Sequence, residues 1–401
     1  MEDYKFDIAI VGGGIVGIAT AFQLQTNFKD LNIVVFEKEK ELAFHQTGRN
    51  SGVIHSGLYY TPGSFKASNC VNGRKQLIKF AKDNDIDFDI CGKIVVAVNE
   101  EESDRLVQLK SNGEKNGLKG LKILSPDEFK KIEPNVDGVK ALWVPETGII
   151  DYKDVTNELS RHVESINPSS KIIKNCEVLD YNDTSIKTSI GDYYAHHIIF
   201  CGGLFSDRLA FKDKIQTDMQ VVAFRGDYYC LSDGAKSKVN NLVYPVPNPH
   251  FPFLGVHFTR MTNGHVECGP NAVFSFKREG YSRTSFNMRD TLQALSFIGT
   301  WKLFINHWKF GFNEYKRAFL KFLFLRELKK MIPSLTMNDI VKSRSGVRAM
   351  ALGNDGKLIE DFKIVASKKN IHVLNAPSPA ATSCLAIGEQ IVEEAKKYFK
   401  L

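Results

Sequence analysis

Several features that would assign the chain to a familiar class are missing. No two of its seven cysteines form a CxxC pair, so neither a zinc site nor a disulfide framework is predicted, and a reducing compartment is expected. No window holds the roughly 18 uncharged apolar residues of a membrane span, and the N-terminus, MEDYKFD, lacks the basic and apolar segments of a signal peptide. We therefore expect a cytoplasmic protein without a metal site, which at most contacts the inner face of a membrane.

The composition is that of an ordinary folded protein. Apolar residues make up 43% and charged residues 25% of the 401 positions, which excludes disorder as the starting assumption. A chain of this length is too long for one simple core and suggests two domains. The formal net charge of +7 is modest, and it is compatible with an acidic substrate, an anionic surface or merely a lysine-rich composition.

A glycine motif stands at the start of the chain in the context that a nucleotide site requires. The apolar run FDIAIV at 6–11 predicts a buried strand, GGGIVG follows, and IATAFQLQ has helical spacing. Gly12, Gly14 and Gly17 match GxGxxG, in which glycines allow a tight turn and close approach of the backbone to a pyrophosphate at the helix N-terminus. A second strand, 31–36, ends at Glu37, which is placed to accept hydrogen bonds from a ribose.

The choice of dinucleotide follows from what the rest of the chain contains. There is no second GxGxxG to hold NAD(P)H and no CxxC to relay electrons, so a disulfide reductase is disfavoured. A second glycine pair, at 202–203, follows the apolar strand HHIIF, and a helix start with small residues is predicted at 377–383. This arrangement favours FAD lying across the domain.

Composition and pattern suggest that the FAD domain is discontinuous. A strand and helix pattern recurs in the middle and in the last 60 residues, whereas aromatic strands with prolines dominate from about 217. We predict an FAD-binding domain of the α/β class from residues 1–90, 145–216 and 336–401. A second α+β domain, for the substrate, would comprise 91–144 and 217–335.

Six blocks carry a resemblance over nearly the whole chain. They are HQTGRNSGVIHSGLYYTPGSFKA (45–67), CGKIVVA (91–97), YPVPNPHFPFLGVHFTR (244–260), CGPNAV (268–273), SGVRAM (345–350) and NAPSPAATSCLAIGE (375–389). The chain resembles the FAD-dependent glycine oxidase and D-amino-acid oxidase superfamily, and within it the L-2-hydroxyglutarate dehydrogenases (oxidases).

The resemblance implies a fold and a reaction. It implies a Rossmann-like FAD-binding domain and a substrate domain built on a mixed sheet over the flavin face. The implied reaction is oxidation of L-2-hydroxyglutarate, a small hydroxy dicarboxylic acid, to 2-oxoglutarate. Electrons would then pass to a membrane quinone or, less efficiently, to oxygen.

Oxidation of a 2-hydroxy acid needs a proton acceptor and cationic partners for the carboxylates. Histidine is the natural acceptor because its ordinary pKa of about 6.5 lies near working pH. His55 and His257 both fall in the matching blocks, and the sequence does not separate them. Arg260 and Arg348 are the candidate carboxylate ligands because the planar guanidinium binds carboxylates through paired hydrogen bonds. Tyr244 could donate its hydroxyl to the substrate.

The remaining candidate residues are assigned to the cofactor. The stretch HQTGRNSGVIHSGLYY (45–60) would lead from the adenosine end of FAD to its ring, and the N–H groups after residue 379 would face the N1 and O2 edge. The predicted cofactor ligands beyond the glycine motif and Glu37 are Lys38, Thr47, Arg49, Asn50, Ser51, Val178, Gly202, Pro379, Ala381 and Thr382.

A basic aromatic stretch at 290–330 leaves two interpretations open. Seven aromatic residues recur there at steps of three or four, and eight lysines and arginines face three acidic residues. One interpretation is a helical stripe packed on the protein core with a solvated basic flank. The other is peripheral contact with a membrane interface, which the implied quinone acceptor favours. We expect no nucleic acid partner, because no recognition motif accompanies the charge.

Two other functions remain as alternatives. The first is an FAD-dependent amino acid or amine oxidase of the same superfamily. The second is a non-catalytic flavin protein whose basic stretch binds RNA.

Overall fold

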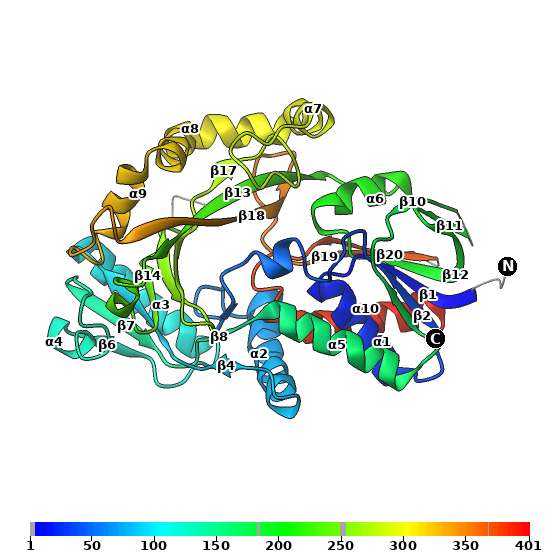
Figure 1. Cartoon of the computed structure of the whole chain (residues 1–401), viewed down its shortest axis with the longest axis horizontal. Helices are drawn as coiled ribbons and strands as arrows, with labels where there is room; N and C mark the ends of the chain where they lie inside the picture. The colour runs from blue at the N-terminus through cyan, green and yellow to red at the C-terminus, as the bar shows by residue number, and fades with distance from the viewer. Residues whose placement is uncertain (1–4, 183–184, 249–253, 368) are drawn as a thin grey trace.

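The computed structural model describes the chain except for residues 1–4, 183–184, 249–253 and 368, and it contains two large sheets (Figure 1). The first sheet has eight strands and contains the N-terminal strand. The second has nine strands and lies at the opposite end of the molecule. A third, small sheet of three strands, β3 (Val53–Ile54), β4 (Phe88–Asp89) and β8 (Gly148–Ile150), lies between them.

The first sheet is parallel at its centre, where β1 pairs with β2 and with β12, and β12 pairs with β20. Its strands are β1 (Lys5–Val11), β2 (Ile33–Phe36), β9 (Lys171–Ile173), β10 (Val178–Tyr181), β11 (Ser185–Thr188), β12 (Gly191–Phe200), β19 (Lys363–Ala366) and β20 (Asn370–Asn375). β2 is buried along its whole length, as expected for a parallel strand with both faces covered. The α/β class predicted from the apolar runs is therefore confirmed.

Four helices cover one face of this sheet: α1 (Ile15–Asn27), α2 (Phe65–Asp83), α5 (Tyr152–Ile166) and α10 (Cys384–Phe399). α1 packs against both α5 and α10, so elements from the N-terminal, middle and C-terminal parts of the chain share one core (Figure 1). Side chains cap two of them, since Ser64 accepts a hydrogen bond from the N–H of Ala67 and Asp151 accepts one from Lys153. α6 (Ser206–Lys212) follows β12 and lies against β20.

The second sheet is mixed, because β14 and β5 are parallel while its other strand pairs are antiparallel. Its strands are β5 (Lys93–Ala97), β6 (Lys122–Leu124), β7 (Lys140–Val144), β13 (Met219–Leu231), β14 (Leu242–Pro245), β15 (His257–Arg260), β16 (Val266–Gly269), β17 (Val273–Phe274) and β18 (Ile340–Gly353). Helices α3 (Glu100–Lys115) and α4 (Pro126–Phe129) pack at the end that contains β6 and β7. This is the second α+β domain on a mixed sheet that the resemblance implied.

One strand lies outside the predicted domain boundaries. Residues 336–401 were expected in the FAD domain, but β18 pairs with β13 from Met219 to Leu231 and belongs to the second sheet. The residues of β18 gave no indication of which sheet the strand joins, because pairing across more than 100 residues depends on tertiary packing.

Residues 288–328 form three helices, α7 (Met288–Ser296), α8 (Ile298–Phe319) and α9 (Lys321–Leu328), which run along the outside of the second sheet (Figure 1). Their inner side contributes Leu303, Phe304 and Tyr315 to a core with β13 and β17. α8 is kinked at His307, whose backbone is not helical. Among the residues that the structure describes, no helix is both long and apolar enough to span a bilayer.

Candidate flavin and substrate site

The glycine motif forms a turn that only glycine can adopt. Gly12 has a φ of +119°, and a Cβ there would lie 2.4 Å from the carbonyl oxygen of Cys201. A Cβ on Gly17 would lie 2.0 Å from the carbonyl oxygen of Gly12, so α1 packs directly on the turn. The N-cap residue of α1, Gly14, has no side chain, and of the first N–H groups that of Ile15 donates a hydrogen bond of 3.1 Å to the hydroxyl of Thr47. The helix therefore presents its positive end to a phosphate.

Glu37 closes the turn from the end of β2. One carboxylate oxygen accepts a hydrogen bond of 2.8 Å from the N–H of Gly13, and the other accepts one of 2.9 Å from the N–H of Glu39. The side chain is 7% exposed, yet it faces the cleft described next. It thus lies where a ribose would be hydrogen-bonded in a dinucleotide.

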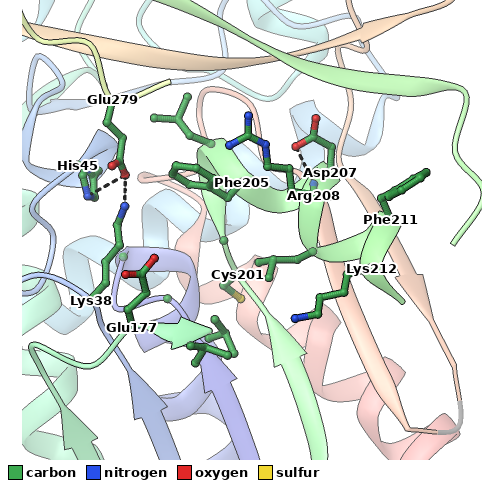
Figure 2. Close-up of a pocket in the computed structure, with 18 of the residues that line it drawn as sticks. Lys38, His45, Glu177, Cys201, Phe205, Asp207, Arg208, Phe211, Lys212 and Glu279 are labelled. Atoms are coloured by element: carbon green, nitrogen blue, oxygen red, sulfur yellow. Dashed lines mark hydrogen bonds and ion pairs between the residues drawn. The ribbon is translucent and has the colours of Figure 1, made fainter. Parts of the chain in front are cut away.

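A cleft of about 1590 Å³ extends from the glycine turn along the carboxyl ends of β1, β2 and β12 (Figure 2). Lys38, His45 and Glu279 lie on one side of it, and Arg208 and Lys212 lie on the other. Seven of the residues predicted to bind the cofactor line this cleft: Gly12, Gly14, Glu37, Lys38, Thr47, Val178 and Gly202. Its glycine turn, helix N-terminus and buried acid fit an adenine dinucleotide.

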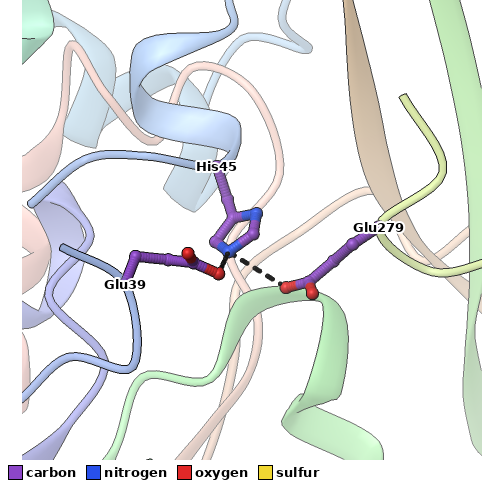
Figure 3. Close-up of side chains that lie close together, drawn as sticks. All are labelled: Glu39, His45 and Glu279. Atoms are coloured by element: carbon purple, nitrogen blue, oxygen red, sulfur yellow. Dashed lines mark hydrogen bonds and ion pairs between the residues drawn. The ribbon is translucent and has the colours of Figure 1, made fainter. Parts of the chain in front are cut away.

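Beside this cleft, Glu39 and His45 of the FAD domain meet Glu279 of the second domain (Figure 3). His45 Nε2 lies 3.0 Å from Glu39 and 3.1 Å from Glu279, and the ammonium of Lys38 forms an ion pair with Glu279. Although the ligand atoms of Glu39, His45 and Glu279 lie within 4.8 Å of one another, Lys38 already supplies a positive partner. Burial, the largest influence, lowers the pKa of His45, and the two glutamates oppose it. These contacts link Lys38 and His45 to Glu279 of the second domain.

The loop at 45–60 is held against β18 by hydrogen bonds. Gln46 accepts a hydrogen bond from the N–H of Ala349, and Arg344 donates to the carbonyl oxygens of Gly48 and Asn50. Arg344 also forms an ion pair of 2.7 Å with Glu267, and the sequence gave no reason to single it out. These hydrogen bonds hold the loop against β18 of the second sheet.

Three predicted cofactor ligands on this loop, Arg49, Asn50 and Ser51, lie beyond the residues that line the cleft. The guanidinium of Arg49 stacks 4.0 Å from the ring centre of Tyr281 and donates to the carbonyl of Phe44. Asn50 donates to the carbonyl of Thr47, and so shapes the loop itself. Ser51 contacts the hydroxyl of Tyr244, which places it beside the histidines described below.

The segment before α10 meets the same loop. The cis peptide before Pro379 leads into a turn in which Ser383 donates to the carbonyl of Pro379, so α10 begins at Cys384, later than the sequence suggested. Thr382 is fully buried, and its hydroxyl accepts a hydrogen bond from the N–H of His55. Within the described chain, the N–H groups of Ala381 and Thr382 have no hydrogen-bond acceptor. They remain available to an anionic ring edge.

His55, which is partly buried, and His257, which is buried, belong to one cluster. Burial lowers the pKa of His55 to about 3, with Lys93 and His257 adding to the effect, and lowers the pKa of His257 to about 4. Both imidazoles are therefore neutral near pH 7. The ring of His257 packs 4.1 Å from that of Tyr244, and its Nδ1 lies 2.9 Å from the carbonyl oxygen of Gly255.

Lys93 also belongs to this cluster, and it was not among the site residues predicted from the sequence. It is 1% exposed, and its ammonium lies 4.4 Å from the ring centre of Tyr59 and 4.9 Å from that of Tyr244. Burial lowers the pKa of Lys93 to about 7. The signal that could have revealed it is a lysine at the start of the apolar strand IVVA, within the block CGKIVVA.

The two predicted arginines have different surroundings. Arg348 lies on β18, donates to the carbonyl oxygen of Asn271, and is close enough to His257 to lower the pKa of that histidine. Burial lowers the pKa of Arg348 itself. Arg260 does not join the cluster: it forms an ion pair with Asp89, which is 51% exposed. Side chains alternate along a strand, so Arg260 and His257, three residues apart on β15, project from opposite faces.

Comparison with known proteins agrees with this geometry. The family model described as FAD dependent oxidoreductase matches residues 7–394. The chain belongs to the FAD-dependent oxidoreductase family. It is accordingly a flavoenzyme, and its cofactor is FAD, which excludes the non-catalytic alternative.

Relatives in this family cover the whole chain. L-2-hydroxyglutarate dehydrogenase of Indibacter alkaliphilus is 44% identical over 98% of this chain and 100% of its own length. The Escherichia coli K12 protein of the same name is 42% identical over 98% and 93%. The mitochondrial one of Bos taurus is 41% identical over 99% and 90%. The resemblance to this group of dehydrogenases is thus confirmed.

Solved structures agree on the fold of this flavoenzyme. L-alpha-glycerophosphate oxidase from Mycoplasma pneumoniae, solved with FAD bound, has a TM-score of 0.76 at 25% identity, covering 98% of this chain and 95% of its own. Glycine oxidase from Geobacillus kaustophilus has a TM-score of 0.69 at 15% identity over 98% and 95%, which shows the shared fold alone.

Proposed function

We propose that this flavoenzyme oxidises L-2-hydroxyglutarate to 2-oxoglutarate. The observation that carries the proposal is the cluster in which two neutral histidines, His55 and His257, lie near two cationic side chains, Lys93 and Arg348. The names of relatives at 41–44% identity over the full length support the substrate. A hydroxy dicarboxylate presents one hydroxyl and two carboxylates, and the cluster supplies a partner for each.

His257 and His55 have separate roles in the proposed reaction. His257 accepts the proton of the substrate hydroxyl at Nε2, since the carbonyl of Gly255 holds the proton of the ring on Nδ1. The hydrogen on C2 leaves with its electron pair as the C=O bond forms, and bound FAD supplies the hydride acceptor at N5. His55, tied to Thr382 at the start of the C-terminal helix segment, shapes the flavin side of the pocket. Low exposure keeps water away from the reacting carbon.

The cofactor is held by residues from three parts of the chain. The turn at Gly12, Gly14 and Gly17 would hold the pyrophosphate of FAD, and Glu37 would hold its ribose. The N–H groups of Ala381 and Thr382, which have no acceptor among the described residues, would stabilise negative charge on the flavin ring. These assignments rest on the cleft and on the open donors described above.

The alternative is an amino acid or amine oxidase, because glycine oxidase shares the fold. The test is anaerobic mixing of the holoenzyme with a panel of hydroxy and amino acids while flavin absorbance is followed. We expect L-2-hydroxyglutarate to bleach the flavin, and glycine, sarcosine and D-amino acids to leave it oxidised. Bleaching by an amine alone would establish the alternative.

We also propose that the outer face of α7–α9 contacts a membrane, where a quinone can receive the electrons. Aromatic side chains on this face are exposed: Trp308 is 62%, Phe312 57% and Phe319 59% accessible. Of the three acidic residues in 290–330, Glu314 is buried and Asp290 is paired with Arg208, so the exposed face is basic. Exposed aromatics among basic side chains suit an interface with anionic lipids. The core-packing interpretation accounts only for the inner side of these helices.

A further inference from the structure

Lys93 is a buried cation without an anionic partner in the described part of the chain. No carboxylate forms an ion pair with its ammonium and no group accepts a hydrogen bond from that ammonium, among the residues that the structure describes. We propose that Lys93 binds the substrate carboxylate remote from the hydroxyl group, and that it thereby selects a 2-hydroxy dicarboxylate. The inference rests on the proposed function and extends it to a specificity-determining residue.

Burial without a partner is costly, and a lysine is seldom retained in a core for packing alone. Lys93 stands at the start of β5, whose next four residues, Ile94 to Ala97, are fully buried and apolar. An apolar side chain of similar length would fill the same space at lower cost. A bound anion is the group that would justify the ammonium at this position.

The surroundings of Lys93 are built for a ligand rather than for a salt bridge. Its ammonium lies between the rings of Tyr59 and Tyr244, which stabilise a cation without neutralising it. The hydroxyl of Tyr59 is also buried and has no hydrogen-bond partner among the described residues. One carboxylate could accept hydrogen bonds from both groups.

The position of Arg348 indicates which of the two substrate carboxylates binds to Lys93. Arg348 lies on the part of β18 that contacts the 45–60 loop, since Ala349 donates to Gln46 and a Cβ on Gly346 would lie 2.4 Å from the carbonyl oxygen of Arg49. The oxidised carbon must lie nearest the flavin, so the carboxylate attached to it falls to Arg348.

Lys93 lies on the other side of the proton acceptor. In the second sheet, β15 with His257 lies between β5, which carries Lys93, and the pair of β13 and β18, which carries Arg348. The hydroxyl carbon at His257 is thus flanked by two cations, one for each end of a dicarboxylate. A monocarboxylic hydroxy acid would leave Lys93 unpaired.

The experiment compares Lys93→Met with the wild-type holoenzyme on two substrates, L-2-hydroxyglutarate and L-2-hydroxyvalerate, which lacks the remote carboxylate. We expect KM for L-2-hydroxyglutarate to rise about 10- to 100-fold, the loss of one charged hydrogen bond, with a smaller change in kcat. For L-2-hydroxyvalerate, kcat/KM should change less than about threefold. An equal loss on both substrates, or no loss on either, would overturn the proposal.

Two controls separate binding from folding and from general electrostatics. Lys66→Met removes another cation that acts on His55, and it should leave the selectivity between the two substrates unchanged. Binding of glutarate, an unreactive dicarboxylate, is read from the flavin spectrum and should weaken in Lys93→Met while FAD content stays at the wild-type level. If wild type binds glutarate through Lys93 but is not reduced by L-2-hydroxyglutarate, the proposed function fails and the role of Lys93 stands.

Discussion

The Nδ1 atom of His257 donates a hydrogen bond to the carbonyl oxygen of Gly255, 2.9 Å away. A carbonyl oxygen can only accept, so the ring proton resides on Nδ1 and the lone pair on Nε2 is available. Burial lowers the pKa of His257 to about 4, so the ring is neutral at pH 7 and Nε2 carries no proton. The ring of Tyr244 packs against it and limits its rotation.

The first prediction concerns the proton acceptor. His257→Asn should lower the rate constant of anaerobic flavin reduction by about 10²- to 10⁴-fold, the usual contribution of a general base, while FAD content is retained. Stopped-flow absorbance measures the rate constant. His265→Asn, in the turn after β15, is the matched control and should react like wild type. If His55→Asn causes the larger loss, His55 is the base instead.

The second prediction is a pH dependence. Since burial lowers the pKa of Lys93 to about 7, the ammonium is present below pH 7 and lost as the pH rises through that value. The two histidines, whose pKa values lie near 3 and 4, stay neutral over the same range. We therefore expect kcat/KM for L-2-hydroxyglutarate to be level from about pH 5 to 6.5 and to fall above pH 7, by up to tenfold per unit. In Lys93→Met this decline should disappear; its persistence would assign it to another group.

The third prediction separates the two arginines. Arg348→Ala should lower kcat/KM about 100-fold or more, because a buried carboxylate loses its charged donor. Arg260→Ala should change it less than about threefold, because the partner of Arg260 is the exposed Asp89. Steady-state assays with an artificial acceptor measure both variants. Equal losses would mean that Arg260 reaches the substrate after all.

The fourth prediction concerns the cofactor turn. Gly17→Ala should lower FAD retention at least about tenfold, because its Cβ would lie 2.0 Å from the carbonyl oxygen of Gly12 and displace the turn from the helix. FAD content after gel filtration measures the effect. Gly234→Ala, where a Cβ would meet no atom within 4 Å, is the control. Full FAD content in Gly17→Ala would show that the turn does not bind the pyrophosphate.

The fifth prediction concerns the membrane. Wild-type protein should float with vesicles containing anionic phospholipid at low salt, and Trp308→Ser with Phe312→Ser should reduce the bound fraction about tenfold. Val107→Ser removes an apolar side chain of similar exposure, 63%, from a distant helix and should not affect flotation. Wild-type protein that stays unbound would contradict the membrane contact.

The nucleotide site could be predicted from the sequence because all of its parts lie close together along the chain. The strand, glycine turn, helix and acid lie within 37 residues. The conformation of each part follows from its own residues and does not depend on the rest of the fold. The structure places Gly12, Gly14 and Glu37 along one cleft, and α1 packs on the turn at Gly17.

The substrate cluster could be predicted only in part, because it is assembled from strands of distant segments. Lys93, His257 and Arg348 come from β5, β15 and β18, and which face of each strand is buried depends on pairing that the sequence does not reveal. Arg260 was a candidate carboxylate ligand because it lies in the block at 244–260, which also holds His257, and the alternation along β15 places the two side chains on opposite faces. Lys93 was missed because a lysine next to an apolar run usually marks the exposed end of a strand.

The most direct test of the account is anaerobic titration of the holoenzyme with L-2-hydroxyglutarate. We predict that one equivalent of substrate bleaches the FAD absorbance and yields one equivalent of 2-oxoglutarate, and that the D enantiomer does neither. An unchanged flavin spectrum with L-2-hydroxyglutarate, in a preparation that another acid or amine reduces, would contradict the proposed function.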